Sequence, residues 1–131
     1  MPTASTATVS SPRATADPIV DSQVDEWLLV SRYDATIARH PDLESQLAPF
    51  RDQHVAHATA LGSTRPDPLP DTGTAPKSPV RALALLAAAE QTARGLRIDA
   101  CVRCSEPALA TTLALIAASE ASHATALETL Q

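Results

Sequence analysis

The sequence predicts an all-α protein, a bundle of four helices around one core. Apolar residues recur at steps of three and four within 43–61 and within 109–130, which is the spacing of a helix that buries one face. Hydrophobic residues make up 44% of the chain but aromatic residues only 2%. The core must therefore consist of Ala, Leu, Ile and Val, which favours closely packed helices over a sheet. With 131 residues, the chain can bury one such core but not two.

The first half of the chain predicts a tail and two helices. Residues 1–18 are rich in Ser, Thr, Ala and Pro, and we expect them to be disordered. The first helix is expected over about 19–39 and the second over 42–61, where Gly62 stops it. Pro49 lies within the second helix and should kink or interrupt it, because proline lacks an N–H and clashes with the preceding turn.

The second half predicts a linker and two more helices. Four prolines lie in the segment 63–78 and forbid regular structure there. Ser78 and Pro79 have the residue types of an N-cap and a first helical position, so the third helix is expected over 79–103. The fourth is expected over 106–130.

The length of the linker predicts the topology of the bundle. An antiparallel helix pair needs only about 2–8 connecting residues, whereas the segment 63–78 has 16. At roughly 3.1 Å per residue in an extended form it reaches about 50 Å, more than the roughly 30 Å of a 20-residue helix. We therefore expect residues 19–131 to form two antiparallel helix hairpins joined by a proline-rich crossover, with the second and third helices parallel.

A short repeat places four ionisable residues in equivalent positions. The five residues that start at His57 return unchanged at His123, and the same offset of 66 residues pairs His54 with Glu120. The i, i+3 spacing brings the two members of each pair to the same helix face. That face is otherwise apolar, and ionisable groups on it lose hydration unless partners meet them. Two such pairs facing each other could hold a metal.

Two further glutamates stand on apolar faces, one in each half. Glu26 lies in the first predicted helix and Glu90 in the third. The residues that share their faces are Ile19, Val30, Tyr33 and Ile37 around Glu26, and Leu83, Leu86, Ala87 and Cys101 around Glu90. Each half therefore has a helix with one inward glutamate, followed by a helix with a polar pair that ends in histidine.

This arrangement resembles the ferritin-like di-iron carboxylate proteins, which are four-helix bundles with one long crossover and carry Glu, Glu-x-x-His, Glu and Glu-x-x-His on successive helices. The resemblance covers residues 19–130 and rests on Glu26, His57, Glu90, Glu120 and His123. Ferritins and rubrerythrins also place a tyrosine seven residues after the first glutamate, as Tyr33 follows Glu26. The stretch 28–36 and the Ala-rich second half also resemble a ferritin-like domain of unknown function found in actinobacterial proteins, many of them lipoproteins.

The resemblance implies a metal site and a class of chemistry. Glu26 and Glu90 would be terminal ligands, Glu120 a bridge between two metals, and Tyr33 a hydrogen-bond donor to a carboxylate. The nitrogen ligands would be His57, His123 and His54. The cofactor would be iron, as a di-iron pair in the family, with O₂- or peroxide-dependent oxidase chemistry.

His54 departs from the family, which has a bridging glutamate at its position. A set of three Glu and three His is less anionic than four Glu and two His, and it suits a single metal, zinc or manganese as well as a di-iron pair. The alternative is a degenerate site without metal in a helical module that docks to another protein or to itself. In that case Glu90 would pair with Arg94 or Arg97 on its own helix.

Composition bounds the partners and the location. A net charge of -5 argues against nucleic acid, and no run of residues is apolar enough for a transmembrane segment. An Ala-rich bundle of this size often forms a homodimer. As the sequence stands, we expect a cytoplasmic protein, or an envelope lipoprotein if the true start lies upstream. Cys101 and Cys104 form a lone C-x-x-C, which we interpret as ordinary helix-end thiols.

Overall fold

The fold consists of helices and their connections. The computed structural model describes residue 3 and residues 17–131, and this part of the chain contains no strand. The prediction of an all-α protein with four helices is therefore confirmed. Most of the segment 1–18, expected to be disordered, lies outside the described residues. The helices are α1 (Pro18–Arg39), α2 (Glu44–Ala60), α3 (Pro79–Arg103) and α4 (Pro107–Thr129), and a 3-10 turn, η1 (Pro41–Leu43), precedes α2.

Side-chain caps fix where the helices begin. Ser78 Oγ accepts a hydrogen bond from the Arg81 backbone N–H at 3.2 Å, and Pro79 follows as the first helical residue. This confirms the predicted start of α3. Asp17 caps α1 in the same way, and the Glu106 side chain accepts two backbone N–H bonds at the start of α4. These caps satisfy main-chain donors that the first turn of a helix leaves without partners.

Gly62 ends α2, as predicted. Its φ of 79° lies in the left-handed region that favours glycine. The backbone N–H groups of Gly62 and Ser63 donate to the carbonyls of Thr59 and Ala58, both at 2.9 Å. This pair of bonds is the Schellman arrangement, and it turns the chain out of the helix into the linker.

Pro49 does not interrupt α2, contrary to the expectation. The helix is continuous from Glu44 to Ala60. Pro49 lies in its second turn, so the missing N–H removes a single main-chain hydrogen bond near the helix start. The chain turns from α1 into α2 at η1, where Pro41 occupies the first position.

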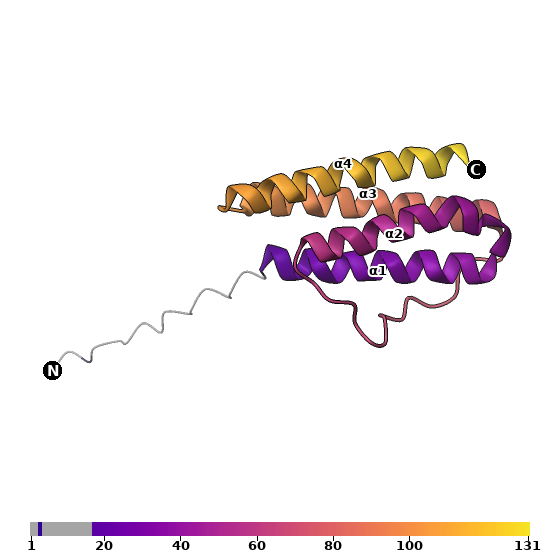
Figure 1. The fold of residues 1–131 in the computed structure, drawn as a ribbon, viewed down its shortest axis with the longest axis horizontal. Helices are drawn as coiled ribbons and strands as arrows, with labels where there is room; N and C mark the ends of the chain where they lie inside the picture. The colour runs from indigo at the N-terminus through magenta and orange to yellow at the C-terminus, as the bar shows by residue number, and fades with distance from the viewer. Residues whose placement is uncertain (1–2, 4–16) are drawn as a thin grey trace.

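Contacts across the bundle give the direction of the helices. Gln23 Nε2 donates to the Leu61 carbonyl at 2.6 Å, while Arg51 donates to Asp34 at 3.2 Å. Residues later in α1 thus contact residues earlier in α2, so these two helices are antiparallel. Figure 1 shows α3 and α4 as a second antiparallel pair that packs against the first.

The linker returns along α1. Trp27 Nε1 donates to Ser63 Oγ at 2.9 Å, Leu69 packs against the buried cluster that contains Trp27, and His40 Nε2 donates to the Pro76 carbonyl at 2.8 Å. Successive linker residues therefore meet successive positions of α1. In Figure 1 the linker leaves the end of α2 and reaches the opposite end of the bundle, where α3 starts, so α2 and α3 run in the same direction.

Two apolar layers enclose a polar layer at the middle of the bundle. One apolar cluster is built from the end of α1 and the starts of α2 and α3, around Tyr33, Leu47 and Leu83. The other lies toward the opposite end, around Leu61 and Leu113. On α2, α3 and α4 the ionisable residues fall between these positions, and on α1 Glu26 lies two turns before Tyr33. None of the helices described is long and apolar enough to cross a membrane.

Candidate metal centre

The predicted ligands meet in the polar layer. Glu26 comes from α1, His54 and His57 from α2, Glu90 from α3, and Glu120 and His123 from α4. The three glutamates and His54 are 0% exposed and His123 is 3% exposed. Only the His57 side chain reaches the surface, with 15% exposed. Burial of this kind strengthens every charge interaction in the layer, because water is excluded from it.

His54 lies between two carboxylates. Its Nδ1 is 2.8 Å from Glu26 Oε2, and its Nε2 is 2.7 Å from Glu90 Oε1. Carboxylates accept hydrogen bonds, so an imidazole that donates to both carries two protons and a positive charge. Burial alone lowers the pKa of His54, but the bonds to Glu26 and Glu90 outweigh it and raise the pKa to about 9.

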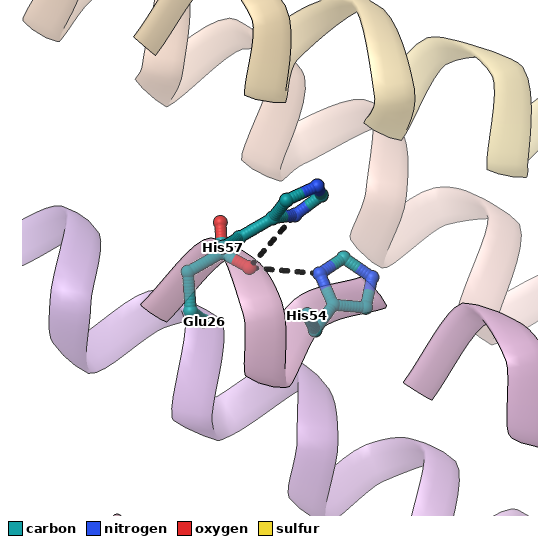
Figure 2. A group of neighbouring side chains, drawn as sticks. All are labelled: Glu26, His54 and His57. Carbon is teal, nitrogen blue, oxygen red and sulfur yellow. Dashed lines mark hydrogen bonds and ion pairs between the residues drawn. The ribbon is translucent and has the colours of Figure 1, made fainter. Parts of the chain in front are cut away.

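Glu26 and the two histidines of α2 form the first ligand group. His57 Nδ1 lies 3.4 Å from Glu26 Oε2, the same oxygen that accepts from His54 (Figure 2). Burial raises the pKa of Glu26, but the contacts with His54 and His57 and the charge of Arg97 hold it well below its usual range. Within the described part of the chain, His57 Nδ1 is a buried atom without a hydrogen-bond partner. A buried polar atom without a partner is uncommon in native proteins, and a bound ion is one way to satisfy it.

Glu90 is the centre of a second ligand group. Its Oε1 accepts from Tyr33 at 2.5 Å, from His54 at 2.7 Å and from His123 Nδ1 at 3.2 Å. Tyr33 therefore does what the resemblance implies, since it donates to a carboxylate of the site. Burial raises the pKa of Glu90, yet the bonds from His123, His54 and Tyr33 lower it to about 2. The second group thus comprises His54, Glu90 and His123.

Arg97 also belongs to the polar layer, although its sequence position suggested a pair with Glu90 in a site without metal. It does not pair with Glu90 on its own helix. It is 1% exposed, and its Nε lies 3.2 Å from Glu26 Oε1 and 3.5 Å from Glu120 Oε1. Its Nη1 donates to Asp25 at 3.1 Å. Burial lowers the pKa of Arg97, but the charges of Glu120 and Glu26 outweigh it and raise the pKa, so a fixed positive charge stands inside the bundle.

Glu120 belongs to neither ligand group, although its carboxyl group lies beside that of Glu26. Among the residues described, neither of its carboxyl oxygens has a hydrogen-bond partner, although both are buried. Burial and the negative charge of Glu26 raise its pKa above the usual range of a carboxylic acid. Among the described residues, Arg97 is the cation that forms an ion pair with it. The position that the resemblance assigns to a bridging ligand is therefore occupied by a carboxyl group that faces a guanidinium.

The donor atoms suit a metal ion. In each group the ligand atoms lie within 4.8 Å of one another, close enough to collapse onto an ion at about 2.0–2.2 Å from each. Imidazole nitrogens and carboxylate oxygens are ligands of zinc, iron and manganese. His54 belongs to both groups through opposite ring nitrogens. Because a neutral imidazole has one free lone pair, His54 serves one ion at a time.

Gln53 is a second residue that sequence reasoning missed. Its side-chain Oε1 lies 2.7 Å from His123 Nε2 and accepts a hydrogen bond from Ser119 at 3.2 Å. It fixes the orientation of the His123 ring from the surface side. The position of Gln53 next to His54 gives no sign of this role, because neighbouring residues on a helix usually point to different faces.

The two cysteines lie at the end of the bundle, away from the ligand groups. Cys101 and Cys104 are free and half-buried. Their thiols donate to the carbonyls of Ala110 and Glu106 at 3.3 and 3.5 Å. These contacts belong to the turn between α3 and α4.

No protein-family model, curated protein or solved structure matches the chain.

Proposed function

We propose that this chain is a ferritin-like metal-binding protein whose first metal site consists of Glu26, His54 and His57. The observation that carries the proposal is the buried Nδ1 of His57, which faces Glu26 Oε2 at 3.4 Å without a hydrogen-bond partner among the described residues. An ion bound there would satisfy this nitrogen and the carboxylate together. Three protein ligands leave a further coordination position open, as in metal sites that carry out chemistry.

The donor set limits the metal. Two imidazoles and one carboxylate favour zinc or ferrous iron, and manganese less, because nitrogen-rich sites suit the later transition metals. Ferrous iron at such a site supplies one-electron chemistry with O₂ or peroxide. The residues of this chain hold the ion, keep bulk water out of the layer and, through Tyr33, orient Glu90 beside it.

The ferritin-like assignment is supported by the arrangement of the halves. Each hairpin contributes one glutamate from its first helix and a histidine from its second, and the linker crosses along the bundle so that α2 and α3 are parallel. One long crossover is a feature of the ferritin-like bundles. The surface exposure of His57 gives an ion a path to the first group without unfolding of the core.

Metal analysis of the purified full chain tests the proposal. The protein is stripped with a chelator, incubated with zinc or, without oxygen, with ferrous iron, and separated from free metal before elemental analysis. We expect the parent to retain metal and His57→Ala to lose most of it. His40→Ala is the matched control, because His40 lies outside the ligand groups and bonds to the linker. Equal retention by the two variants, or none by the parent, would reject the proposal.

A metal-free helical module is the second candidate, and one observation favours it. His54 and Arg97 already place two positive charges among three buried glutamates, so the layer is partly neutralised without an ion. Under this alternative the polar layer specifies how the helices pack, and the protein acts by docking to a partner. Full stability in chelator, with no gain on metal addition, would favour it.

A further inference from the structure

Arg97 stands in one half of the bundle where Tyr33 stands in the other. Tyr33 follows Glu26 by seven residues, and Arg97 follows Glu90 by seven. Each side chain crosses to the glutamate of the opposite half: Tyr33 donates to Glu90, and Arg97 Nε donates to Glu26. The two hairpins are thus matched in position but differ in charge at this point. One half has a neutral donor, and the other has a permanent cation.

The guanidinium occupies the space between two carboxyl groups. Its Nε is within 3.5 Å of both Glu26 Oε1 and Glu120 Oε1, and the side chain is 1% exposed. A metal held between these two groups would need the same carboxyl oxygens and the same volume. Glu120, which Arg97 contacts in this way, belongs to neither ligand group.

The charge of Arg97 acts in the same direction as its position. The guanidinium is a permanent cation, and it lies against the carboxyl groups of Asp25, Glu26 and Glu120. A second divalent ion beside the guanidinium would meet a like charge at short range, and burial strengthens the repulsion between them.

From these relationships we infer that Arg97 takes the place of a second metal ion and restricts the site to one. The inference rests on the proposed function, because it specifies how many ions that site accepts. Removal of the guanidinium frees Glu120 and Glu26 Oε1 as ligands and removes the repulsion between the guanidinium and a second ion. Arg97 is thereby a determinant of stoichiometry and not a ligand.

The number of ions bound per chain tests the inference. Native mass spectrometry and elemental analysis are applied to the full chain loaded with zinc alone or, without oxygen, with ferrous iron alone. We expect one ion in the parent and two in Arg97→Gln. Arg97→Tyr, which reproduces the residue of the other half, should also bind two and serves if the glutamine variant does not fold. Circular dichroism and thermal melting establish folding.

Two controls separate charge and position. Arg97→Lys keeps the positive charge and should bind one ion. Arg94→Gln removes the same charge from an exposed position of the same helix and should also bind one. Two ions in the parent, or one in a folded neutral variant at position 97, overturn the inference while the proposed function stands. No ion in the parent means that the proposed function itself fails, and the inference falls with it.

Discussion

Glu26 and Glu90, on different helices of different hairpins, are joined by a single imidazole. The two nitrogens of His54 lie 2.8 and 2.7 Å from their carboxylates, and all three side chains are buried. Without metal, this charged ring holds the two halves of the polar layer together. Both the stability of the protein and its affinity for metal should therefore depend on the protonation of His54.

Stability without metal should fall between pH 6.5 and 9. The folded-state pKa of His54, about 9, exceeds its ordinary value of 6.5, so the contribution of His54 to stability is complete below pH 6.5 and disappears as the pH rises through 9. A shift of this size corresponds to about 3 kcal/mol. Glu120 acts in the same direction, because its raised pKa keeps it protonated in the fold.

Urea denaturation of the chelator-treated protein at several pH values measures this effect. His54→Gln should show a shallower pH dependence than the parent, with the part due to Glu120 remaining, whereas His40→Gln should retain the full slope of the parent. If the slope of His54→Gln equals that of the parent, the His54 ring is not charged in the folded protein.

Metal binding should release a proton below pH 9. His54 donates from both nitrogens in the absence of metal, and it must lose one proton before a nitrogen can bind an ion. The apparent affinity should therefore rise about tenfold per pH unit across this range. Calorimetry in buffers of different ionisation enthalpy counts the protons released. Binding without release would show that His54 stays protonated and is not a ligand.

Tyr33→Phe should destabilise the metal-free protein by about 1.5–3 kcal/mol, the usual worth of a hydrogen bond to a charged group. The Tyr33 hydroxyl donates to Glu90 at 2.5 Å, and the residue is 0% exposed. Phenylalanine keeps the packing of the ring and removes only this donor. Denaturant unfolding at neutral pH provides the measurement, and a loss below about 0.5 kcal/mol would mean that Glu90 is satisfied by the histidines alone.

His54→Glu should lower the stability of the metal-free protein and raise its affinity for metal. The variant recreates the second Glu-x-x-His of the ferritin-like pattern and adds a fourth carboxylate to a layer that contains one guanidinium. Without metal it should melt at a lower temperature than the parent, because buried carboxylates repel each other and lose hydration. Zinc or ferrous iron should raise its melting temperature more than that of the parent. His54→Gln, which adds no charge, should not show this larger gain, and equal gains in all three proteins would place position 54 outside the site.

The sequence predicts the helices and most of the polar layer because both depend on local patterns. Glu26, His54, Glu90 and His123 stand on apolar stripes, and a stripe faces the core whatever the neighbouring helix contributes. The position of Arg97 depends instead on a long side chain that crosses to another helix. Its seven-residue distance from Glu90, which matches that of Tyr33 from Glu26, was a signal that could have placed it.

The expected break at Pro49 was wrong for a related reason. Proline has a high average cost inside a helix, but the local structure decides what that cost disrupts. Here Pro49 lies in the second turn of α2, where its missing N–H removes a single main-chain hydrogen bond, so the helix continues.

The crossover linker makes the association of the two hairpins intramolecular. The second ligand group takes His54 from the first hairpin and Glu90 and His123 from the second, so neither hairpin can complete it alone. A flexible connection of this length supplies an effective concentration on the order of millimolar. At micromolar protein this amounts to roughly a thousandfold, or about 4 kcal/mol, in favour of assembly. If the chain were cleaved near Gly73, the halves would have to find each other by diffusion, and the second ligand group would form only at protein concentrations high enough for the halves to associate.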